Sequence, residues 1–281
     1  MKVFTDADPD GFCGAWVLKT AVESGKLANP DPTFEIFAVD YVKGFPMDIV
    51  DKDETVFIVD YSIEPAQMDE LLKKTSEVYW IDHHASALEK FEGYDKEIKG
   101  LRDTDYASCE NCYRFVMGED APLPEVVKMV GDFDTWRWQE LDNRDAYQFI
   151  LGISIQNLHP DTGCWETFEE NPRKYVAFGK VIDAAKLEEF RGLHEKMFVV
   201  DDFEGHKALV LNAPARGFFA FEERTDLDDY EVFLMYHRND DKYQFSIFSQ
   251  NESPDVSKIA AKLGGGGHAG AAGFVLEEMP F

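Results

Sequence analysis

Three short apolar runs in the N-terminal part of the sequence each end at acidic or imidazole side chains. The runs have the β-branched and aromatic content of buried strands: Met1–Phe4, Thr55–Val59 and Glu77–Ile81. Polar groups follow each run: Asp6, Asp8 and Asp10 after the first, Asp60 after the second, and Asp82, His83 and His84 after the third. Because ligands of open α/β sheets bind beyond the carboxyl ends of the strands, this pattern predicts one polar site built from three strand ends.

The predicted site would concentrate negative charge in one crevice. Carboxylates that share a crevice repel one another strongly unless cations are present, since unpaired buried charge is costly. A mixture of carboxylate and imidazole ligands suits Mn²⁺, Fe²⁺ or Co²⁺, with Mg²⁺ as an alternative. The number of acidic ligands favours two metal ions. An Asp-His-His triplet alone would carry little weight, because adjacent histidines at a strand end are often structural.

Helical patterns separate the predicted strands. A helix is expected over residues 12–24, and a second one begins at Pro65, a favoured first helical position. Strands that alternate with helices indicate βαβ units and a doubly wound, mainly parallel sheet. The pattern is then mainly helical over 107–153, irregular over 157–172 and helical again over 175–199.

Beyond residue 200 the pattern returns to strands. We expect strands over 207–212, 231–236 and 243–248, followed by a helix over 256–263 that leads into four consecutive glycines. The chain is therefore expected to have three parts: an α/β metal-binding domain at 1–155, a linker with a long helix at 156–200, and a smaller α/β domain at 201–281.

The sequence is strongly acidic. Among its 281 residues are 55 Asp and Glu but only 28 Lys and Arg, which gives a formal net charge of −27. Proteins that hold long nucleic acids neutralise many phosphates with Lys and Arg, so we expect no long nucleic acid as a partner. A small anionic substrate held through metal ions fits this balance better. The chain has neither an apolar run of 18 residues nor the regions of a signal peptide, so a cytoplasmic protein that does not cross a membrane is expected.

Five segments resemble the motifs of the DHH phosphoesterase superfamily, and the resemblance extends along nearly the whole chain. The family takes its name from the triplet Asp82-His83-His84, and Asp6–Gly11 is similar to its first motif in the RecJ-like form Asp-x-Asp-x-Asp-Gly. The other matching segments are Val59–Ser62, Gly131–Trp136 and the glycine-rich segment Gly264–Phe274, which resembles the signature of the DHH-associated C-terminal domain. Because several motifs occur in order together with this C-terminal signature, the match to the superfamily is specific.

The resemblance implies a metal-binding role for each matching acid or imidazole. Asp8 would bind the first metal ion and Asp10 the second, and Asp60 would bridge them. His83 and Asp134 would complete the second site, with Asp132 as an alternative to Asp134. Asp6 would bind the first ion or orient another ligand, because many members that act on small substrates have a histidine near this position instead.

The remaining matches imply roles toward the substrate. Asp82 would orient an imidazole, and His84 would face the scissile phosphate. The backbone of Gly265, Gly266 and Gly267 would approach an anion closely, and His268 would add a donor; a flexible linker is the alternative for this glycine run. Relatives that cut short oligonucleotides often have an arginine in the strand where this chain has Phe248. Arg216 would replace that arginine, or Phe248 would stack on a base.

Together these features predict a phosphodiesterase with two divalent metal ions, Mn²⁺ preferred and Mg²⁺ or Co²⁺ as alternatives. The ions would lower the pKa of a shared water that attacks phosphorus in line. The expected substrates are short oligonucleotides or cyclic dinucleotides, hydrolysed to mononucleotides. Alternatives are a phosphatase or exopolyphosphatase on a non-nucleotide anion, a RecJ-like single-strand exonuclease, and a non-catalytic nucleotide-binding protein. The sequence leaves the oligomeric state open.

Overall fold

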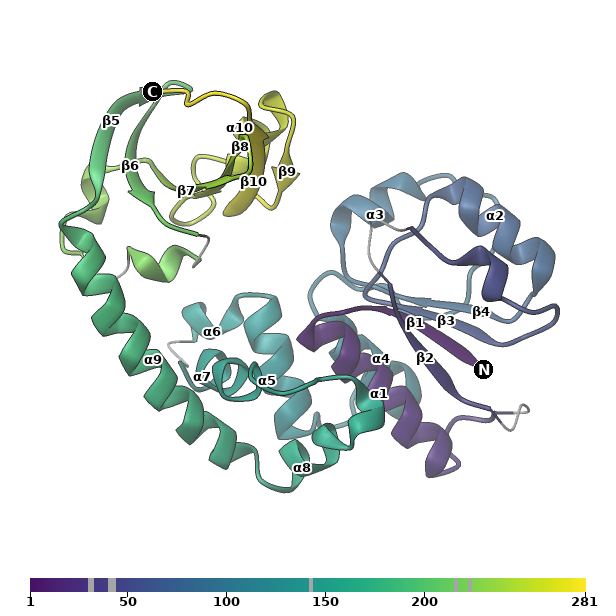
Figure 1. The fold of residues 1–281 in the computed structure, drawn as a ribbon. Helices are drawn as coiled ribbons and strands as arrows, with labels where there is room; N and C mark the ends of the chain where they lie inside the picture. Colours follow the sequence, from purple (N-terminus) through teal and green to yellow (C-terminus); the bar gives the residue numbers. More distant parts are fainter. Residues whose placement is uncertain (30–32, 40–43, 142–143, 215–216, 222–223) are drawn as a thin grey trace. The chain divides into compact units, whose positions relative to one another are not determined.

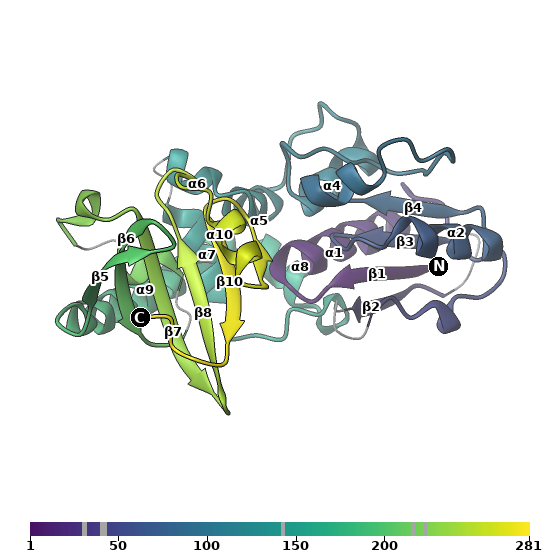
Figure 2. The same cartoon turned by 90° about the horizontal axis from the view of Figure 1, so that it is seen from above.

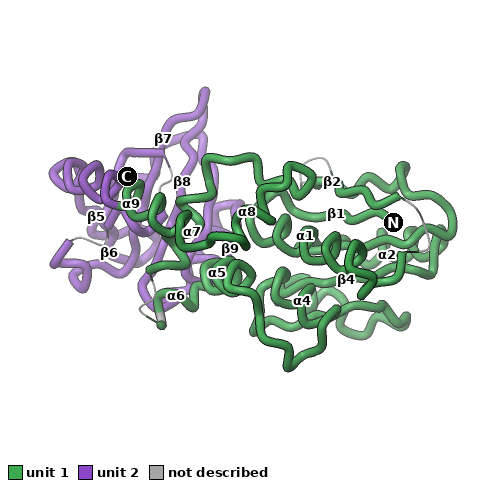
Figure 3. The backbone as a smooth tube through the Cα atoms, turned by 90° about the horizontal axis from the view of Figure 1, so that it is seen from below, with its two compact units in different colours: residues 1–183 green, residues 184–281 purple. Residues whose placement is uncertain are grey.

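A computed structural model describes residues 1–29, 33–39, 44–141, 144–214, 217–221 and 224–281. The chain forms two compact units, residues 1–183 and residues 184–281 (Figure 3). The expected division into 1–155, 156–200 and 201–281 stays a prediction. Within the described ranges, no helix combines the length and apolar character needed to cross a membrane.

The first unit contains strands in its first half and helices in its second. Its elements are, in chain order, β1 (Lys2–Asp6), α1 (Pro9–Glu23), β2 (Glu35–Val39), the 3-10 turn η1 (Met47–Ile49), β3 (Val56–Val59), α2 (Pro65–Lys74), β4 (Val78–Ile81), α3 (Ala85–Lys90), α4 (Ser108–Met117), α5 (Glu125–Asp134), α6 (Arg137–Glu140), α7 (Arg144–Ile153), the 3-10 turn η2 (Pro160–Thr162) and α8 (Cys164–Glu170). The long helix α9 (Pro172–His194) begins in this unit and ends in the second.

A parallel sheet with the strand order β2-β1-β3-β4 forms the centre of the first unit, as Figure 2 shows. The chain adds β2 on one side of β1, and then β3 and β4 on the other side. The direction of winding therefore reverses between β1 and β3, which is the position where doubly wound sheets bind ligands. Thr5 pairs with Val59 at the last register position of these two strands. Consequently Asp6, the last residue of β1, and Asp60, which follows β3, lie at adjacent strand ends.

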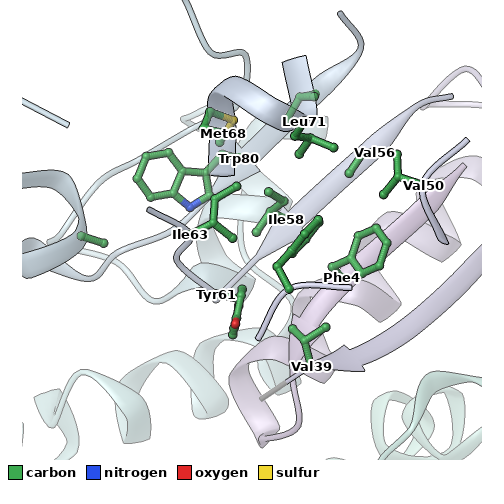
Figure 4. Packing of buried hydrophobic residues seen from close by; sticks show 13 residues of the cluster. Phe4, Val39, Val50, Val56, Ile58, Tyr61, Ile63, Met68, Leu71 and Trp80 are labelled. Atoms are coloured by element: carbon green, nitrogen blue, oxygen red, sulfur yellow. The ribbon is translucent and has the colours of Figure 1, made fainter. Parts of the chain in front are cut away.

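Helices cover both faces of this sheet. Figure 1 shows α1 and α4 on one face and α2 and α3 on the other. Because side chains alternate along a strand, Phe4, Ile58 and Trp80 all point toward α2, where they form a buried core with Met68 and Leu71 (Figure 4). The strands are apolar on both faces, as expected for a buried parallel sheet. This packing fixes the strand ends that carry the polar residues.

The second unit is built on another sheet, with the strand order β5-β6-β7-β8-β10-β9. Its elements are β5 (Phe198–Phe203), β6 (His206–Asn212), the 3-10 turns η3 (Phe218–Ala220) and η4 (Leu227–Asp229), β7 (Val232–Asn239), β8 (Lys242–Phe248), α10 (Val256–Lys262), β9 (Gly266–Gly267) and β10 (Ala271–Leu276). Val256, Ile259 and Ala260 of α10 pack into its apolar core. A parallel sheet followed by a second, smaller α/β unit confirms the predicted fold class.

Three expectations about secondary structure that were drawn from the sequence are wrong. Helix α1 begins at Pro9 rather than residue 12, because the Asp8 carboxylate caps it by accepting the Gly11 N–H at 2.8 Å. The segment 157–172, expected to be irregular, contains η2 and α8. The helix expected over 175–199 runs from Pro172 to His194 and is followed by β5, which begins within the expected range.

Gly11 lies where α1 closely approaches the end of β1. A Cβ atom at this position would be 2.4 Å from Oγ1 of Thr5 and 2.6 Å from the carbonyl oxygen of Asp6. We expect Gly11→Ala to lower the free energy of unfolding by on the order of 1–3 kcal/mol, since either α1 or β1 must move. Urea unfolding of both proteins measures the difference.

Gly192 provides a matched control. It lies in the exposed part of α9, and a Cβ atom there would meet nothing within 4 Å. We expect Gly192→Ala to raise the free energy of unfolding by roughly 0.5–1 kcal/mol, because alanine loses less conformational freedom in a helix. Equal effects of the two substitutions would contradict the packing argument for Gly11.

Candidate metal centre

Acidic and imidazole side chains from separate elements converge beyond the carboxyl ends of β1, β3 and β4. Two groups have ligand atoms that all lie within 4.8 Å of one another: Asp60, His83 and His84, and Asp10, His83 and Asp134. The structure therefore brings together residues that are as far apart in sequence as Asp10 and Asp134. Their roles as metal ligands stay predictions.

His83 lies at the centre of this cluster. Its Nε2 atom is 3.2 Å from Oδ2 of Asp134, 3.5 Å from Oδ1 of Asp60 and 3.9 Å from Oδ2 of Asp10. These carboxylates come from the end of α5, the end of β3 and the first turn of α1. One imidazole nitrogen thus faces three carboxylates, an arrangement that a bound cation would stabilise.

Asp134 rather than Asp132 faces the cluster. Asp134 is the last residue of α5. The Asp132 carboxylate is buried on another side of the helix, where it contacts the Lys128 ammonium and accepts a hydrogen bond from Nε of Arg137 at 3.1 Å. Its charge is therefore already paired with two cations.

Two residues at the site have a left-handed backbone. Asp60 has φ of 53° at the end of β3, and Trp136 has φ of 61° two residues after Asp134. This region is unfavourable for residues other than glycine and is seen mainly for Asn, Asp and His. Strained backbone of this kind is concentrated at functional sites. The surrounding packing therefore holds the Asp60 carboxylate in a position that a regular strand would not give.

Asp82 is a hydrogen-bond acceptor for its neighbours and is fully buried. Its Oδ2 accepts from Nε1 of Trp80 at 3.0 Å and from the Ser62 hydroxyl at 2.9 Å, while its Oδ1 lies 2.8 Å from Nδ1 of His84. Burial would raise the pKa of Asp82, but hydrogen bonds from His84 and Ser62 lower it below the ordinary value. Asp82 thus fixes the orientation of the His84 ring.

The same contact favours a protonated His84. Burial lowers the pKa of this imidazole, but the hydrogen bond and negative charge of Asp82 outweigh burial and raise the pKa above its ordinary value. Since Nδ1 is directed at Asp82, Nε2 is the nitrogen that can donate to a ligand. An imidazolium held in this way is suited to contact a phosphoryl oxygen.

The N-terminus of α4 holds two of the clustered carboxylates. The backbone N–H groups of Ser108 and Cys109 each donate to Asp10 at 2.8 Å. The Ser108 hydroxyl donates to Oδ1 of Asp60 at 3.0 Å. The sequence analysis missed these contacts because two of the three donors belong to the backbone, which has no sequence signature.

Asp6 and Asp8 belong to neither group of converging ligand atoms. The Asp6 carboxylate accepts the N–H of Ala7 at 2.7 Å. Burial, with the negative charge of Asp10 adding to it, raises the pKa of Asp8 to about 6, and hydrogen bonds with the Gly11 N–H and with Asp60 oppose this increase. Asp8 is therefore close enough to interact with the cluster.

The donor set fits divalent metal ions. Burial and the negative charges of Asp10 and Asp8 raise the pKa of Asp60 and that of Asp134 well above their ordinary values. Several aspartates that share buried space, with one imidazole between them, match the oxygen and nitrogen ligands that Mn²⁺, Co²⁺ or Mg²⁺ take. Bound cations would remove the repulsion that raises these pKa values.

The second unit holds the glycine-rich segment, and two of its glycines have structural reasons. A Cβ atom at Gly265 would lie 2.0 Å from the carbonyl oxygen of Gly273, and one at Gly267 would lie 2.5 Å from Cα of Ala272. Both are needed because the segment 265–267 closely approaches β10. At Gly266, by contrast, a Cβ atom would meet nothing within 4 Å, so packing does not explain this glycine.

The other predicted substrate contacts in this unit are His268, Arg216 and Phe248. His268 is exposed and lies directly after β9. Its backbone N–H donates to the carbonyl of Ala271 at 2.8 Å and closes the turn into β10. Arg216 lies outside the described residues. Phe248 is buried in the unit, with 7% of its surface exposed, so its ring does not offer a face for stacking on a base.

Two curated relatives match most of the chain. An uncharacterized protein of Acanthamoeba polyphaga mimivirus is 23% identical over 252 residues, which cover 84% of this chain and 56% of that protein. The oligoribonuclease NrnB of Bacillus subtilis is 25% identical over 250 residues, which cover 79% of this chain and 59% of that protein. The chain thus spans little more than half the length of these relatives. No protein-family model matches the chain.

Solved structures with a similar fold cover nearly all of the chain. The DHH domain of a member of the s1p family of ribosomal proteins has a TM-score of 0.55 at 16% identity, over 97% of this chain and 81% of that one. The chain shares the fold of this DHH domain. A second DHH-fold neighbour, the pGpG-specific phosphodiesterase PggH from Vibrio cholerae, has a TM-score of 0.53 at 13% identity, over 98% of this chain and 92% of that one. The resemblance predicted from the DHH motifs is confirmed.

The raised carboxylate pKa values predict how the stability of the metal-free protein depends on pH. Asp8, Asp60 and Asp134 have higher pKa values in the folded protein than the ordinary value of about 3.9 that applies after unfolding. The folded chain therefore binds more protons than the unfolded chain in the pH range between these values. It follows that the Tm of the metal-free protein rises as the pH falls from 7.5 to 5.5.

A substitution separates this effect from the general loss of negative charge. Asp60→Asn removes one of the raised carboxyls, so we expect a smaller rise in Tm over the same pH interval. Asp241→Asn, at a fully exposed side chain, is the matched control and should keep the wild-type rise. Thermal unfolding in a chelating buffer measures all three proteins. The cluster would lack the inferred repulsion if both variants kept the same rise.

Proposed function

We propose that the chain is a divalent-metal-dependent phosphodiesterase that hydrolyses short oligonucleotides or cyclic dinucleotides to mononucleotides. The observation that carries the proposal is the convergence of Asp10, Asp60 and Asp134 on Nε2 of His83. Burial, with the negative charges of Asp10 and Asp8 adding to it, raises the pKa of Asp60 and that of Asp134, so the negative charge of the cluster is poorly compensated without cations. Holding these carboxylates together lowers the stability of the folded chain. A role in metal-assisted hydrolysis accounts for the presence of such a cluster.

Each residue of the cluster would have a definite role. Asp60 would bridge two metal ions, with Asp8 on the first ion and with Asp10, His83 and Asp134 on the second. When bound, the ions would supply an activated water and neutralise charge on the phosphoryl oxygens.

His84 would act on the substrate rather than on the metal ions. Asp82 holds its Nδ1 atom at 2.8 Å, which keeps the ring oriented and protonated. The N–H at Nε2 would donate to a phosphoryl oxygen and stabilise the charge that develops there. Neither a serine nor a cysteine nucleophile is required.

Charge and similarity both support a small substrate. The net charge of −27 opposes a long polyanion, because phosphates outside the site would meet carboxylates rather than Lys or Arg. The Bacillus subtilis relative is named an oligoribonuclease, and the Vibrio cholerae neighbour a pGpG-specific phosphodiesterase. These names support short nucleotide substrates.

A turnover screen with Mn²⁺ tests the proposal. The substrates are linear dinucleotides, short oligomers, cyclic dinucleotides and polyphosphate. Release of mononucleotides from the first three would support the proposal, whereas release of phosphate from polyphosphate alone would replace it by the exopolyphosphatase alternative. Nucleotide binding without turnover in saturating Mn²⁺ would identify a non-catalytic binder.

The acidic composition predicts that substrate length is limited. Initial rates should be highest for oligomers of a few nucleotides and should fall as more phosphates extend beyond the site, where they meet repulsion. A ladder of single-stranded oligomers at constant ionic strength measures this dependence. Rates that hold or increase beyond roughly a dozen nucleotides, about the upper range of a single-strand site, would instead indicate a RecJ-like exonuclease.

The two histidines of the proposed mechanism belong to different units, so their loss should have different effects. We expect His83→Ala to reduce metal content, because it removes the nitrogen that faces three carboxylates. His268→Ala should keep full metal content and lower kcat/KM by on the order of ten- to a hundredfold, the cost of one charge-assisted contact to phosphate. Metal analysis and steady-state kinetics measure both quantities.

Gly266→Ala provides a companion variant in the second unit. Because a Cβ atom at Gly266 meets no neighbour, the variant should keep the wild-type Tm. A methyl group there would nevertheless obstruct an anion that approaches the backbone, and KM should increase.

If His268→Ala loses metal as completely as His83→Ala, then His268 is a ligand and the assignment of substrate binding to this segment is wrong.

A further inference from the structure

Ser108, the first residue of α4, contacts both carboxylates that lie at the topological switch point. Its side chain is fully buried, and its hydroxyl donates to Oδ1 of Asp60 at 3.0 Å. Its backbone N–H donates to Oδ2 of Asp10 at 2.8 Å, and the N–H of Cys109 donates to Oδ1 of the same carboxylate at 2.8 Å. One helix terminus thus holds two aspartates from separate elements, Asp10 in the first turn of α1 and Asp60 after β3.

The start of α4 needs these acceptors. The first N–H groups of a helix have no partner within the helix, and the N-cap residue Ala107 has no side-chain oxygen to accept them. Asp10, which belongs to α1, takes this capping role from 98 residues away in the sequence. The positive end of the helix dipole also favours a negative charge at this point. The same two hydrogen bonds therefore cap α4 and hold the Asp10 carboxylate in place.

The contacts leave both carboxylates able to bind cations. A carboxylate has about four lone-pair positions, and the helix uses one on each oxygen of Asp10. On Asp60 the hydroxyl holds Oδ1 only, and this oxygen is also the one that lies 3.5 Å from Nε2 of His83. The hydroxyl of Ser108 therefore limits rotation of the Asp60 carboxylate while other positions stay available.

An ion pair between the buried Glu110 and the partly exposed Arg137 holds the same helix start in place. Glu110 accepts the Ala107 N–H at 3.0 Å, and its two carboxylate oxygens each accept from Nη2 of Arg137 at 2.7 Å. Arg137 begins α6, three residues after Asp134. The α4 terminus is thus connected to the segment that carries the ligand from α5, so a shift of α4 would disturb every part of the cluster.

We infer that Ser108 is a positioning residue of the metal centre. Its hydroxyl sets the plane of the Asp60 carboxylate relative to Asp10, so that the two acids are arranged for metal before metal arrives. The inference rests on the proposed function, in which Asp10 and Asp60 are metal ligands. Preorganised ligands bind more tightly because less freedom is lost on binding. Neither the DHH motifs nor the converging ligand atoms include this serine.

The test compares two variants of nearly equal size at position 108. Ser108→Thr keeps a hydroxyl, whereas Ser108→Val replaces it with a methyl group. We expect Mn²⁺ affinity, measured without substrate by calorimetry and by electron paramagnetic resonance, to be ten- to a hundredfold lower in Ser108→Val than in Ser108→Thr, the usual effect of losing a group that orients a ligand. Ser108→Ala, which adds no bulk, should have the same reduced Mn²⁺ affinity as Ser108→Val. It replaces the other two variants in the test if their larger side chains prevent folding.

Thr75→Val is the matched control for loss of a buried hydroxyl elsewhere. Thr75 is buried and donates to the carbonyl of Glu54 at 2.6 Å, outside the metal centre. Its substitution should lower Tm and leave Mn²⁺ affinity unchanged. Equal affinity in Ser108→Thr and Ser108→Val, or equal losses in Thr75→Val and Ser108→Ala, would overturn the positioning role. A wild-type protein that binds no Mn²⁺ would instead reject the proposed function itself.

Discussion

Repulsion among aspartates held at one point of a parallel sheet is the constraint on which the rest of the structure depends. The sheet places Asp10 and Asp60 side by side because its winding reverses between β1 and β3. Nothing in the hydrophobic core offsets their charge, so the polar surroundings must. Helix N–H groups, the Ser108 hydroxyl and the His83 imidazole all direct donors at these carboxylates. Burial and the neighbouring carboxylates still raise the pKa of Asp60 well above its ordinary value, and this uncompensated negative charge makes the site suited to cations.

Much of the first unit could be predicted from its sequence, for a simple physical reason. Strands buried on both faces are continuous apolar runs, and each run here stops at a polar residue, so strand ends and site residues are visible together. The parallel arrangement then brings the ends to one edge. Asp134 is different, because it lies at the end of a helix whose position relative to the sheet depends on packing. Only the resemblance to a family motif pointed to it, and its role as a ligand stays a prediction.

Contacts made by the backbone could not be predicted in this way. Ser108 looks like an ordinary residue at the start of a helix, and nothing in the sequence indicates that its N–H reaches Asp10. The same holds for the glycine-rich segment. A glycine required by close packing and a glycine required for access of a ligand look the same in the sequence. The structure separates them: Gly265 and Gly267 are required because the chain approaches β10 closely at these positions, whereas Gly266 is not. Helix α8 was missed because its short length gave no clear periodicity.

The double use of Asp10 has a consequence for how such a protein could change in evolution. A mutation of Asp10 removes a candidate ligand and also uncaps α4, so chemistry and architecture would be lost together. Asp134 accepts no comparable backbone bond among those described, and its side chain is partly exposed. A descendant that lost the proposed hydrolysis and kept only nucleotide binding would therefore be expected to lose Asp134 first and to retain Asp10 for its structural role.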